Sequence, residues 1–464
     1  MAVACGYNHS AAVSEDGFLF FCGEHQAGLI GYGEAANEYD DKVTIFTQAQ
    51  CIPAPVLMVS LGSVHTGIVT DEGELFMCGS GNRGILGVGD LNGRDIPTRI
   101  PKNLFHGEAV LMVACRYTHT AVLTQPGMVY TFGNGKNGRL GHGDEVDQLS
   151  PKRVDSLFTK GVHAVMIAAG VAHTVALDKN GNVFTWGNGG KGRLGHNDEQ
   201  NQLEPVEVNP ACFGGRKITF ISANGLHNAA VTAEGLLFTW GLNASGQLGH
   251  NDNITRFTPT LMQTGPLAQS LAVMAACGVR FTLVVTRDGG LWATGCNEME
   301  QLGLGDFHDR FFFHQVGLSN GFSRRRVTTA AAGRHHSAVV TSDGEIWTWG
   351  AGCEGELGHG VSSLDTQFLT VPTRVQGFDE EHTRIGRFVR PRAEQTLPVL
   401  MSLHTRLGAQ SLLSTLSDDS IEEIINSLVA VPGRVRENKS LMTLLGFANV
   451  PRLRMCRTCN LPVS

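Results

Sequence analysis

The chain has 464 residues, of which 42% are hydrophobic and 17% are charged, so it holds ample apolar material for a folded core and is neither disordered nor fibrous. No apolar run approaches the roughly 18 residues that span a bilayer, which excludes a membrane-spanning helix. Eleven cysteines, an odd number scattered along the chain, indicate reduced thiols in an intracellular protein, and we expect the cytoplasm rather than the nucleus.

The charge is unevenly distributed along the chain. The formal net charge of -7 divides into -11 for residues 1–380 and +4 for residues 381–464. An acidic body lacks the basic surface with which proteins grip DNA phosphates, so direct DNA binding is not expected. We predict two parts, a folded domain over residues 1–379 and a different C-terminal extension over residues 380–464.

A repeat of about 54 residues organises the first part. A histidine follows a short apolar run in six of seven units, at intervals of 54 to 56 residues, and Phe281 takes this position in the remaining unit. The glycine of a Leu-Gly or Ile-Gly pair lies 22 residues after each of these positions. A period of this length predicts a closed array of small units. The repeated histidines are His9, His65, His119, His173, His227 and His336.

Each repeat contains a strand-turn-strand pattern. In chain order, the clearest examples are residues 67–70 and 75–78, residues 173–177 and 183–186, and residues 338–341 and 346–349, each pair joined by a turn that contains glycine. Seven units of about four short strands cannot bury a core alone, and radial closure removes the strand edges that an open array would expose. The sequence therefore predicts an all-β, seven-bladed β-propeller.

A motif inside the repeats carries a family resemblance. Residues 138–144 read Gly-Arg-Leu-Gly-His-Gly-Asp, and residues 192–198 and 246–252 are close variants. With seven copies in phase, residues 1–379 resemble the regulator of chromosome condensation repeat family. The resemblance implies a seven-bladed propeller whose sequence repeats are offset from its blades and whose first and last blades are closed by the two termini. One departure is Arg116, which replaces the first glycine of the third unit.

The repeated histidines could form a metal ring or act as catalytic bases. We interpret them instead as structural residues that tie the turns of each blade by a hydrogen bond to the backbone, because Phe281 fills the same position and cannot bind a metal. A second set of histidines follows the Leu-Gly pair and is interpreted in the same way. No cofactor, metal or catalytic residue is predicted, because no hydrolase, metalloprotease or phosphate-loop motif occurs. The second set is His142, His196, His250 and His359.

The two residues before each repeated histidine are candidates for partner binding. A plant ultraviolet-B photoreceptor of this fold has Gly-Trp-Arg-His-Thr at this place and displays the middle residues on a partner-binding face. All five tryptophans of this chain lie elsewhere, on the second strand of the hairpins, so photoreception is not expected. Tyrosine and arginine dominate binding hot spots. The predicted partner-binding residues are Tyr7, Arg116, Tyr117, Arg280, Arg334 and His335.

Three functions are compatible with the resemblance. We predict a non-enzymatic scaffold or adaptor that binds a protein partner on one propeller face. The name-giving member of the family exchanges nucleotide on a small GTPase, using a propeller face and a protruding β-wedge, and it binds nucleosomes through a basic N-terminal tail. This chain starts directly at a predicted strand, and no interval between repeats has the extra length of a wedge. Exchange activity on a Ran-like small GTPase is therefore the second possibility.

The C-terminal extension suggests the third function. A basic linker precedes a predicted helix whose apolar residues, from Ile421 to Val429, share one face and end before Pro432. Residues 397–445 faintly resemble an F-box, which would make the chain a substrate-recognition adaptor that binds a ubiquitin-ligase subunit. Cys456 and Cys459 have the spacing of half a zinc site, but no second pair lies nearby. The linker arginines are Arg384, Arg387, Arg390 and Arg392.

Overall fold

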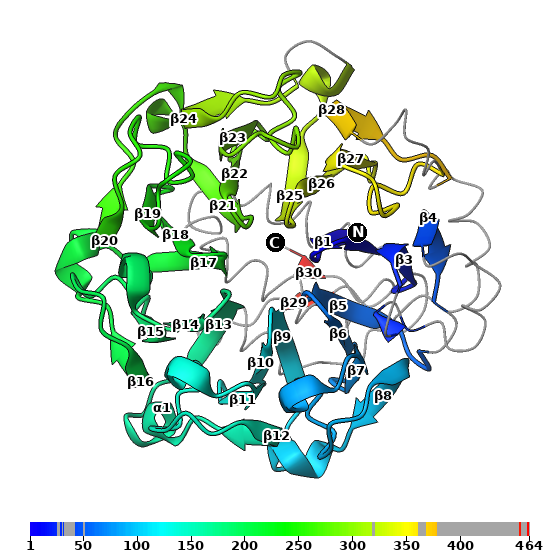
Figure 1. Ribbon diagram of the computed structural model, residues 1–464, viewed down its shortest axis with the longest axis vertical. Coiled ribbons are helices and arrows are strands. Elements are labelled where there is room, and N and C mark those ends of the chain that lie inside the picture. The colour runs from blue at the N-terminus through cyan, green and yellow to red at the C-terminus, as the bar shows by residue number, and fades with distance from the viewer. Residues whose placement is uncertain are drawn as a thin grey trace. The chain divides into compact units, whose positions relative to one another are not determined.

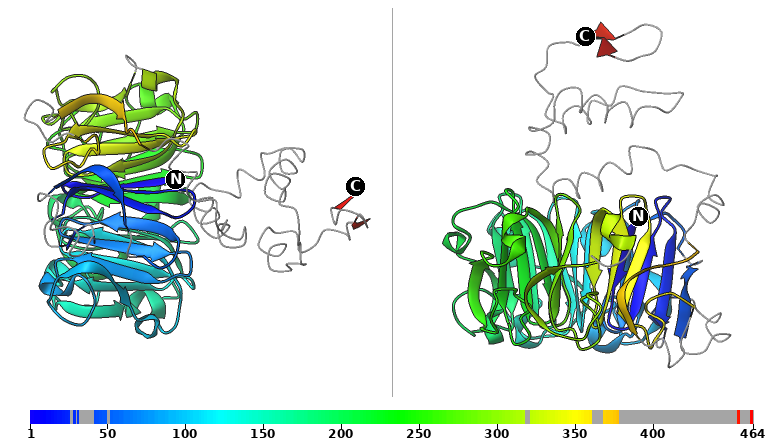
Figure 2. Two further views of the ribbon diagram at one scale, coloured as in Figure 1. Left: turned by 90° about the vertical axis from the view of Figure 1, so that its right-hand side faces the viewer. Right: turned by 90° about the horizontal axis from the view of Figure 1, so that it is seen from above.

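The chain forms a seven-bladed β-propeller, as the sequence predicted (Figure 1). The computed structural model describes residues 1–25, 28–29, 31, 42–49, 52–317, 321–360, 368–377, 454–455 and 462–463. The chain has two compact units, Met1–Ala409 and Gln410–Ser464. The first unit contains seven four-stranded antiparallel sheets arranged as blades around a central axis, and the views in Figure 2 show these blades from the side.

Each blade consists of four strands that are consecutive in the sequence, with the first strand nearest the axis. Blade 1 contains β1 (Ala2–Cys5), β2 (His9–Val13), β3 (Leu19–Glu24) and β4 (Lys42–Gln48). Blade 2 contains β5 (Val56–Leu61), β6 (His65–Thr70), β7 (Leu75–Gly79) and β8 (Arg94–Ile100). Blade 3 contains β9 (Val110–Arg116), β10 (His119–Thr124), β11 (Val129–Gly133) and β12 (Gln148–Arg153). Blade 4 contains β13 (Ala164–Ala169), β14 (His173–Asp178), β15 (Val183–Gly187) and β16 (Gln202–Glu207).

The remaining blades repeat this arrangement. Blade 5 contains β17 (Ile218–Asn224), β18 (His227–Thr232), β19 (Leu237–Gly241) and β20 (Arg256–Leu261). Blade 6 contains β21 (Ala272–Cys277), β22 (Phe281–Thr286), β23 (Leu291–Gly295) and β24 (Arg310–Gln315). Blade 7 contains β25 (Val327–Ala332), β26 (His336–Thr341), β27 (Ile346–Ala351) and β28 (Phe368–Arg374). In the second unit β29 (Arg454–Met455) pairs with β30 (Pro462–Val463).

Short helical turns connect the strands. The only α-helix of the described residues is α1 (Asp155–Thr159), between blades 3 and 4. The 3-10 turns are η3 (Asn82–Gly84), η4 (Lys102–Phe105), η5 (Lys136–Gly138), η6 (Gly190–Gly192), η7 (Pro210–Phe213), η8 (Pro266–Gln269) and η9 (Gly321–Arg324). None of the helices in the described ranges has the length and apolar content needed to cross a bilayer.

The blade boundaries differ from those implied by the family resemblance. The sequence repeats coincide with the blades, and no sheet among the described residues combines strands from both ends of the propeller. The reason is that Ala2–Cys5 already supplies the inner strand of blade 1 within its own repeat. Blade 1 closes the ring by packing β1 against β25 and β26 of blade 7, and a single bridge joins Ile45 to His359.

Glycines are required where the blades are tightly packed. Gly187 ends β15 opposite His173 with φ of 108°, and a Cβ there would lie 2.6 Å from the carbonyl oxygen of Ala172. The Leu-Gly glycines have a second role, because they contact the neighbouring blade. A Cβ on Gly141 would lie 2.7 Å from Nε1 of the buried Trp186. The excess of glycine therefore reflects both turn geometry and the packing between blades.

Candidate interaction surface

A chain of hydrogen bonds joins every blade to the next. The residue after each repeated histidine position donates its side-chain hydrogen bond to a main-chain carbonyl of the preceding blade, at 2.6 to 2.8 Å. We call these acceptors the seam-carbonyl residues. The donors are Ser10, Thr66, Thr120, Thr174, Asn228, Thr282 and Ser337, and their acceptors are Glu356, Leu29, Ile85, Arg139, Arg193, Gln247 and Gln301, respectively.

Five of the repeated histidines extend this network, with a different partner from the one predicted. The expected acceptor was backbone in the same blade, whereas Nε2 of each histidine bonds the side chain of a seam donor in the next blade, at 2.7 to 3.0 Å. Four of these partners are hydroxyls that already give their proton to the carbonyl, and the fifth is the amide oxygen of Asn228, which can only accept, so Nε2 of each histidine must be the donor. The five pairs are His65 with Thr120, His119 with Thr174, His173 with Asn228, His227 with Thr282, and His336 with Ser10.

Burial accounts for the neutral state of these rings. It lowers the pKa of His65, His173 and His336 to about 3 and that of His227 to about 4. Two seams lack the histidine bond, because Phe281 has no donor and the nitrogens of His9 have no partner among the described residues. The second set of histidines acts within single blades. Each bonds a threonine hydroxyl on the third strand at 2.9 to 3.0 Å, as in His142 with Thr131.

Five of the six predicted partner-binding residues lie in the loops between the first and second strands of the blades, and Arg116 is the last residue of β9. We call the side that carries these seven loops the loop face. Neighbouring loops are in contact around the ring. The Ser63 hydroxyl donates to the carbonyl of Tyr117 at 2.9 Å, and the Val279 amide donates to the carbonyl of Gly333 at 3.2 Å. The loop face is therefore joined across several of the junctions between blades.

Arg116 is placed differently from the prediction, because its guanidinium is engaged inside the propeller. Its Nε donates to Oδ1 of Asn224 in blade 5 at 2.8 Å. Its Nη atoms reach the carbonyls of Cys5 at 3.4 Å, Leu61 at 3.2 Å and Ala332 at 3.3 Å, in blades 1, 2 and 7. A side chain of blade 3 that reaches inner strands of four other blades must cross the axis. Burial lowers its pKa to about 10.

Four of the predicted residues form one arc of the loop face, over blades 6, 7 and 1. The guanidinium carbon of Arg334 lies 4.2 Å from the ring centre of Tyr7, a cation–π contact between blades 7 and 1. Arg280 of blade 6 donates to the Ser245 hydroxyl at 2.7 Å. His335 is close enough to both arginines that their positive charges, together with burial, lower its pKa to about 4. We call Tyr7, Arg280, Arg334 and His335 the arginine arc.

Tyr117 lies outside this arc, on blade 3. Its side chain is 45% exposed, and its backbone has φ of 40°, an uncommon conformation for a residue with a side chain. Arg116 immediately before it is drawn toward the axis, whereas Tyr117 faces solvent. The structure thus separates two adjacent residues that the sequence pattern assigned to the same role.

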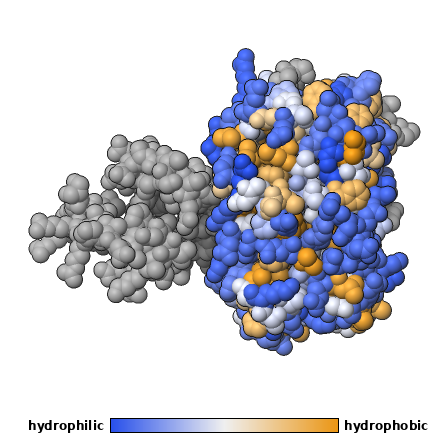
Figure 3. Space-filling view, turned by 90° about the vertical axis from the view of Figure 1, so that its left-hand side faces the viewer, coloured by the Kyte–Doolittle hydropathy of each residue, from blue (hydrophilic) through white to orange (hydrophobic). Residues whose placement is uncertain are grey.

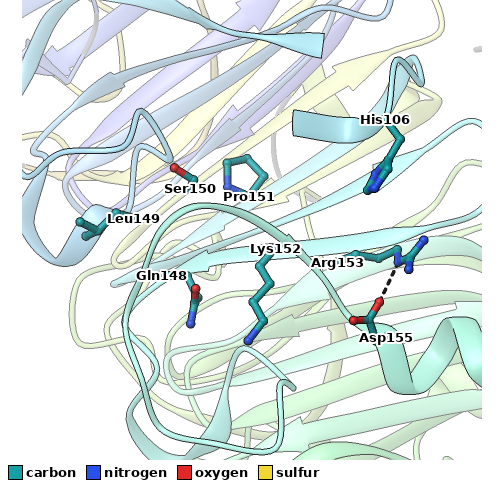
Figure 4. A pocket seen from close by; sticks show the side chains of 8 residues that line it. All are labelled: His106, Gln148, Leu149, Ser150, Pro151, Lys152, Arg153 and Asp155. Atoms are coloured by element: carbon teal, nitrogen blue, oxygen red, sulfur yellow. Dashed lines mark hydrogen bonds and ion pairs between the residues drawn. The ribbon is translucent and has the colours of Figure 1, made fainter. Parts of the chain in front are cut away.

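The other surfaces of the propeller show weaker signs of a binding site. A shallow pocket of about 540 Å³ lies along β12 on the outer side of blade 3, and its Arg153–Asp155 ion pair is drawn in Figure 4. None of the sequence-predicted residues line it. The outer rim that Figure 3 shows has small apolar patches divided by polar side chains. The pocket residues are His106, Gln148, Leu149, Ser150, Pro151, Lys152, Arg153 and Asp155.

The described residues contain no group of three or more histidine, cysteine or carboxylate side chains placed to hold a metal ion. The predictions for the C-terminal extension fall outside the described residues. These are the basic linker, the helix that begins near Ile421, the F-box-like segment over residues 397–445, and the pair Cys456 and Cys459.

Sequence reasoning missed Asn224, which pairs with Arg116. The signal was present, because Asn224 and Arg116 both occupy the glycine position three residues before a repeated histidine. Two departures from glycine at one repeat position are expected to be compensatory when the blades face each other across an axis. Asn224 also donates to the carbonyl of Cys277 at 2.9 Å, so the pair reaches blade 6 as well.

Comparison with known proteins gives a consistent result. The RCC1-like domain family matches residues 56–389. The chain is 30% identical over 370 residues to the ultraviolet-B receptor UVR8 of Arabidopsis thaliana, covering 79% of this chain and 80% of the receptor. It is 31% identical over 339 residues to the E3 ubiquitin-protein ligase HERC2 of Homo sapiens, covering 71% of this chain but only 7% of the ligase.

The solved structures show the same fold. Yeast RCC1 (Prp20), in its complex with Kap60, superposes with a TM-score of 0.68 at 24% identity, covering 79% of this chain and 85% of that one. Human WBSCR16 superposes with a TM-score of 0.63 at 21% identity, covering 74% and 87% of the two chains. Family match, sequence identity and blade architecture together show that the chain belongs to the RCC1-like domain family.

Proposed function

We propose that the chain is a non-enzymatic adaptor that binds a protein partner through the arginine arc of its loop face. One observation carries the proposal. Arg280, Arg334, Tyr7 and His335 come from three blades and gather on one accessible arc, held by the Arg334–Tyr7 contact and the Arg280–Ser245 hydrogen bond. Arginine and tyrosine supply the large, rigid contacts that dominate binding energy at interfaces.

The arc carries little compensating charge. Arg280 has one carboxylate nearby, with 3.6 Å between its Nη1 and Oε2 of Glu298, and both side chains are substantially exposed. Such exposed pairs contribute little and exchange readily for a partner's carboxylates. His335 adds no positive charge at neutral pH because its pKa is held near 4. The arc therefore favours a partner surface that combines acidic and apolar groups.

Two relatives indicate partner classes to test first. The yeast Prp20p structure was described together with its binding to Gsp1p and histones, and HERC2 is named as a ubiquitin ligase. Recovery of a small GTPase or of a ubiquitin-ligase subunit as the bound partner would make the proposal more specific. For location we propose the interior of the cell, in the cytoplasm rather than the nucleus. Cys5, Cys115 and Cys277, which are buried reduced thiols, support a reducing compartment.

The test is affinity purification of the full chain with quantitative mass spectrometry, comparing wild type with R280E/R334E. The matched control is K179E/R324E, which reverses two exposed cations on loops of the opposite side of the propeller. We expect R280E/R334E to lose specific interactors that the control retains. Equal recovery of every interactor by both variants would contradict the proposal.

Two further readings separate the partner classes. A GTPase that is retained by the chain and released by added nucleotide would indicate an exchange factor. Ligase subunits that disappear when Gln410–Ser464 is deleted would indicate a ubiquitin-ligase adaptor whose propeller selects the substrate.

A further inference from the structure

One of the seam-carbonyl residues, Arg193, has side-chain donors whose role in the fold is not apparent. Their carbonyls all accept the bond from the next blade, but their side chains differ between blades: apolar in blades 1 and 2, arginine in blades 3 and 4, and glutamine or glutamate in blades 5 to 7. All seven are nearly inaccessible to solvent. A polar group in such a place is expected to have a partner.

Each of the five polar side chains has at least one partner in its own surroundings, but Nε2 of Gln247 and Nε2 of Gln301 have none among the described residues. Gln247 accepts from the Ser245 amide at 2.9 Å, Gln301 from the Met299 amide at 2.9 Å, and Glu356 from the Glu354 amide at 2.7 Å. Arg139 is bonded on three sides. It donates to the carbonyl of Lys136 at 2.8 Å, the hydroxyl of Thr118 at 2.9 Å and the carbonyl of Val171 at 3.3 Å.

Arg193, the other arginine among the seam-carbonyl residues, has fewer partners than Arg139. It is only 7% exposed, and its Nε donates to the carbonyl of Gly190 at 2.7 Å. Its two Nη groups have no hydrogen-bond or ion-pair partner within the described part of the chain, and they are not fully shielded from solvent. The repeat explains the difference, because the position of Thr118 in blade 3 is taken in blade 4 by Ala172, which has no hydroxyl. The carbonyl corresponding to Val171 is that of Gly225, which accepts from the Val171 amide at 3.2 Å.

The charges around Arg193 do not neutralise it. Burial lowers its pKa to about 10, the positive charge of Arg139 adds to this effect, and Glu199 opposes it without forming an ion pair. A guanidinium that is mostly withdrawn from water and has four N–H donors without a protein partner costs folding free energy. Glutamine fits the same position in blades 5 and 6, so the fold does not require a cation there.

We propose that Arg193 anchors a carboxylate side chain of a protein partner, inserted into the loop face between blades 4 and 5. The two Nη groups match the two oxygens of one carboxylate, the geometry that arginine recognises best. Lys191, exposed on the same loop, adds a positive charge at the entrance.

A single carboxylate fits this site better than a polyanion. The loop beside it exposes Asp198 and Glu199, whose charges repel a nucleic-acid backbone that must bring many phosphates at once. A lone Asp or Glu on an otherwise apolar or basic protein segment passes this rim with far less repulsion. The expected ligand is therefore an acidic side chain within a protein segment.

This site lies on the same face as the arginine arc but on different blades, so the two proposals can fail separately. The variant R193Q introduces the residue that blades 5 and 6 already hold at this position. In urea denaturation of the full chain we expect R193Q to be at least as stable as wild type. The matched variant R139Q, which removes a bonded arginine, should be clearly less stable. A loss in R193Q as large as that in R139Q would assign Arg193 to the fold and overturn the proposal.

Binding is tested with a displayed library of random 12-residue peptides selected on the full chain. Peptides that compete at this site should share one Asp or Glu. Exchange of that acidic residue for Asn or Gln should weaken binding at least tenfold, about 1.4 kcal/mol, and so should the R193Q substitution. The two changes combined should weaken binding no more than either change alone. R280E/R334E should leave these peptides bound.

Three results of the selection would overturn the proposal. They are selected peptides with no shared acidic residue, unchanged affinity in R193Q, and tighter binding of a phosphoserine peptide than of its glutamate counterpart. The last result would show that the site is built for a phosphate.

Discussion

Substitution of Arg116 by methionine tests whether this residue braces the propeller or contacts a partner. Methionine keeps most of the length and apolar stem of arginine but removes every donor. The variant loses the 2.8 Å bond to Asn224 and three longer bonds to the carbonyls of Cys5, Leu61 and Ala332. These acceptors are in blades 5, 1, 2 and 7, so one substitution breaks the hydrogen bonds that link blade 3 to four other blades.

The expected loss follows from the bond lengths. A charge-assisted bond of good geometry contributes about 1.5–3 kcal/mol, and we take about 0.5 kcal/mol for each of the three longer ones. The sum is about 3–4.5 kcal/mol. Removing a buried cation that has no carboxylate partner among the described residues returns some desolvation free energy. We therefore expect the free energy of unfolding to fall by about 2–4 kcal/mol.

The assay is equilibrium urea denaturation of the full chain, followed by tryptophan fluorescence. Trp186, Trp240 and Trp349 are fully buried and report on the seams between blades. The control is R334M, which removes an arginine whose recorded contact is with the Tyr7 ring, worth about 0.5–1 kcal/mol at a partly exposed site. A double-mutant cycle with N224A should give a coupling energy above about 1 kcal/mol. Unchanged stability in R116M together with loss of partner binding would refute the reasoning and restore the role predicted from the repeat position.

Two further outcomes follow from the seams. The T120V substitution removes the hydroxyl that joins His65 to the carbonyl of Ile85 and leaves both groups buried without a partner, so we expect a loss of about 2–4 kcal/mol in denaturation experiments. T98V on the outer strand β8 should cost less than about 0.5 kcal/mol, and equal losses in the two variants would contradict the network. Acidification should also destabilise the chain, because the folded pKa values of His65, His173 and His336 are about 3 while an unfolded histidine titrates near 6.5. The unfolded state then binds more protons as pH falls from about 6.5 toward 3, and each histidine contributes a slope of up to about 1.4 kcal/mol per pH unit. H336Q should reduce the proton uptake measured on unfolding at pH 5 by about one, and a stability that stays flat between pH 7 and 5 would rule out this account.

The sequence indicated the architecture well because its signals were local and repeated. The spacing from His65 to Gly87 recurs in every unit, and the turn at residues 178–181 identifies a hairpin without reference to the rest of the chain. The seam partners could not be found in this way. His65 bonds Thr120, 55 residues away, and the pair becomes visible only when the ring places blade 2 beside blade 3.

The two arginines of the shared motif show the same limit. Arg139 and Arg193 stand in identical Gly-Arg-Leu-Gly-His sequences, yet Nη1 of Arg139 has two hydrogen-bond acceptors and the Nη groups of Arg193 have none among the described residues. What separates them is Thr118 against Ala172, each 21 residues before its arginine. A motif predicts the backbone around a side chain, whereas the partners of that side chain come from loops outside the motif.

Because every blade is one continuous segment, the ring can close whichever two blades the chain ends lie between. The seam between blades 7 and 1 is held by Ser10, Glu356 and His336 in the same way as the covalently continuous seams. The covalent link between two neighbouring blades thus keeps them close together but is not needed for the hydrogen bonds of their seam. A circularly permuted chain, opened in the exposed residues 263–265 that precede η8 and joined between residue 377 and Met1 by a flexible linker, should close into the same seven-bladed ring.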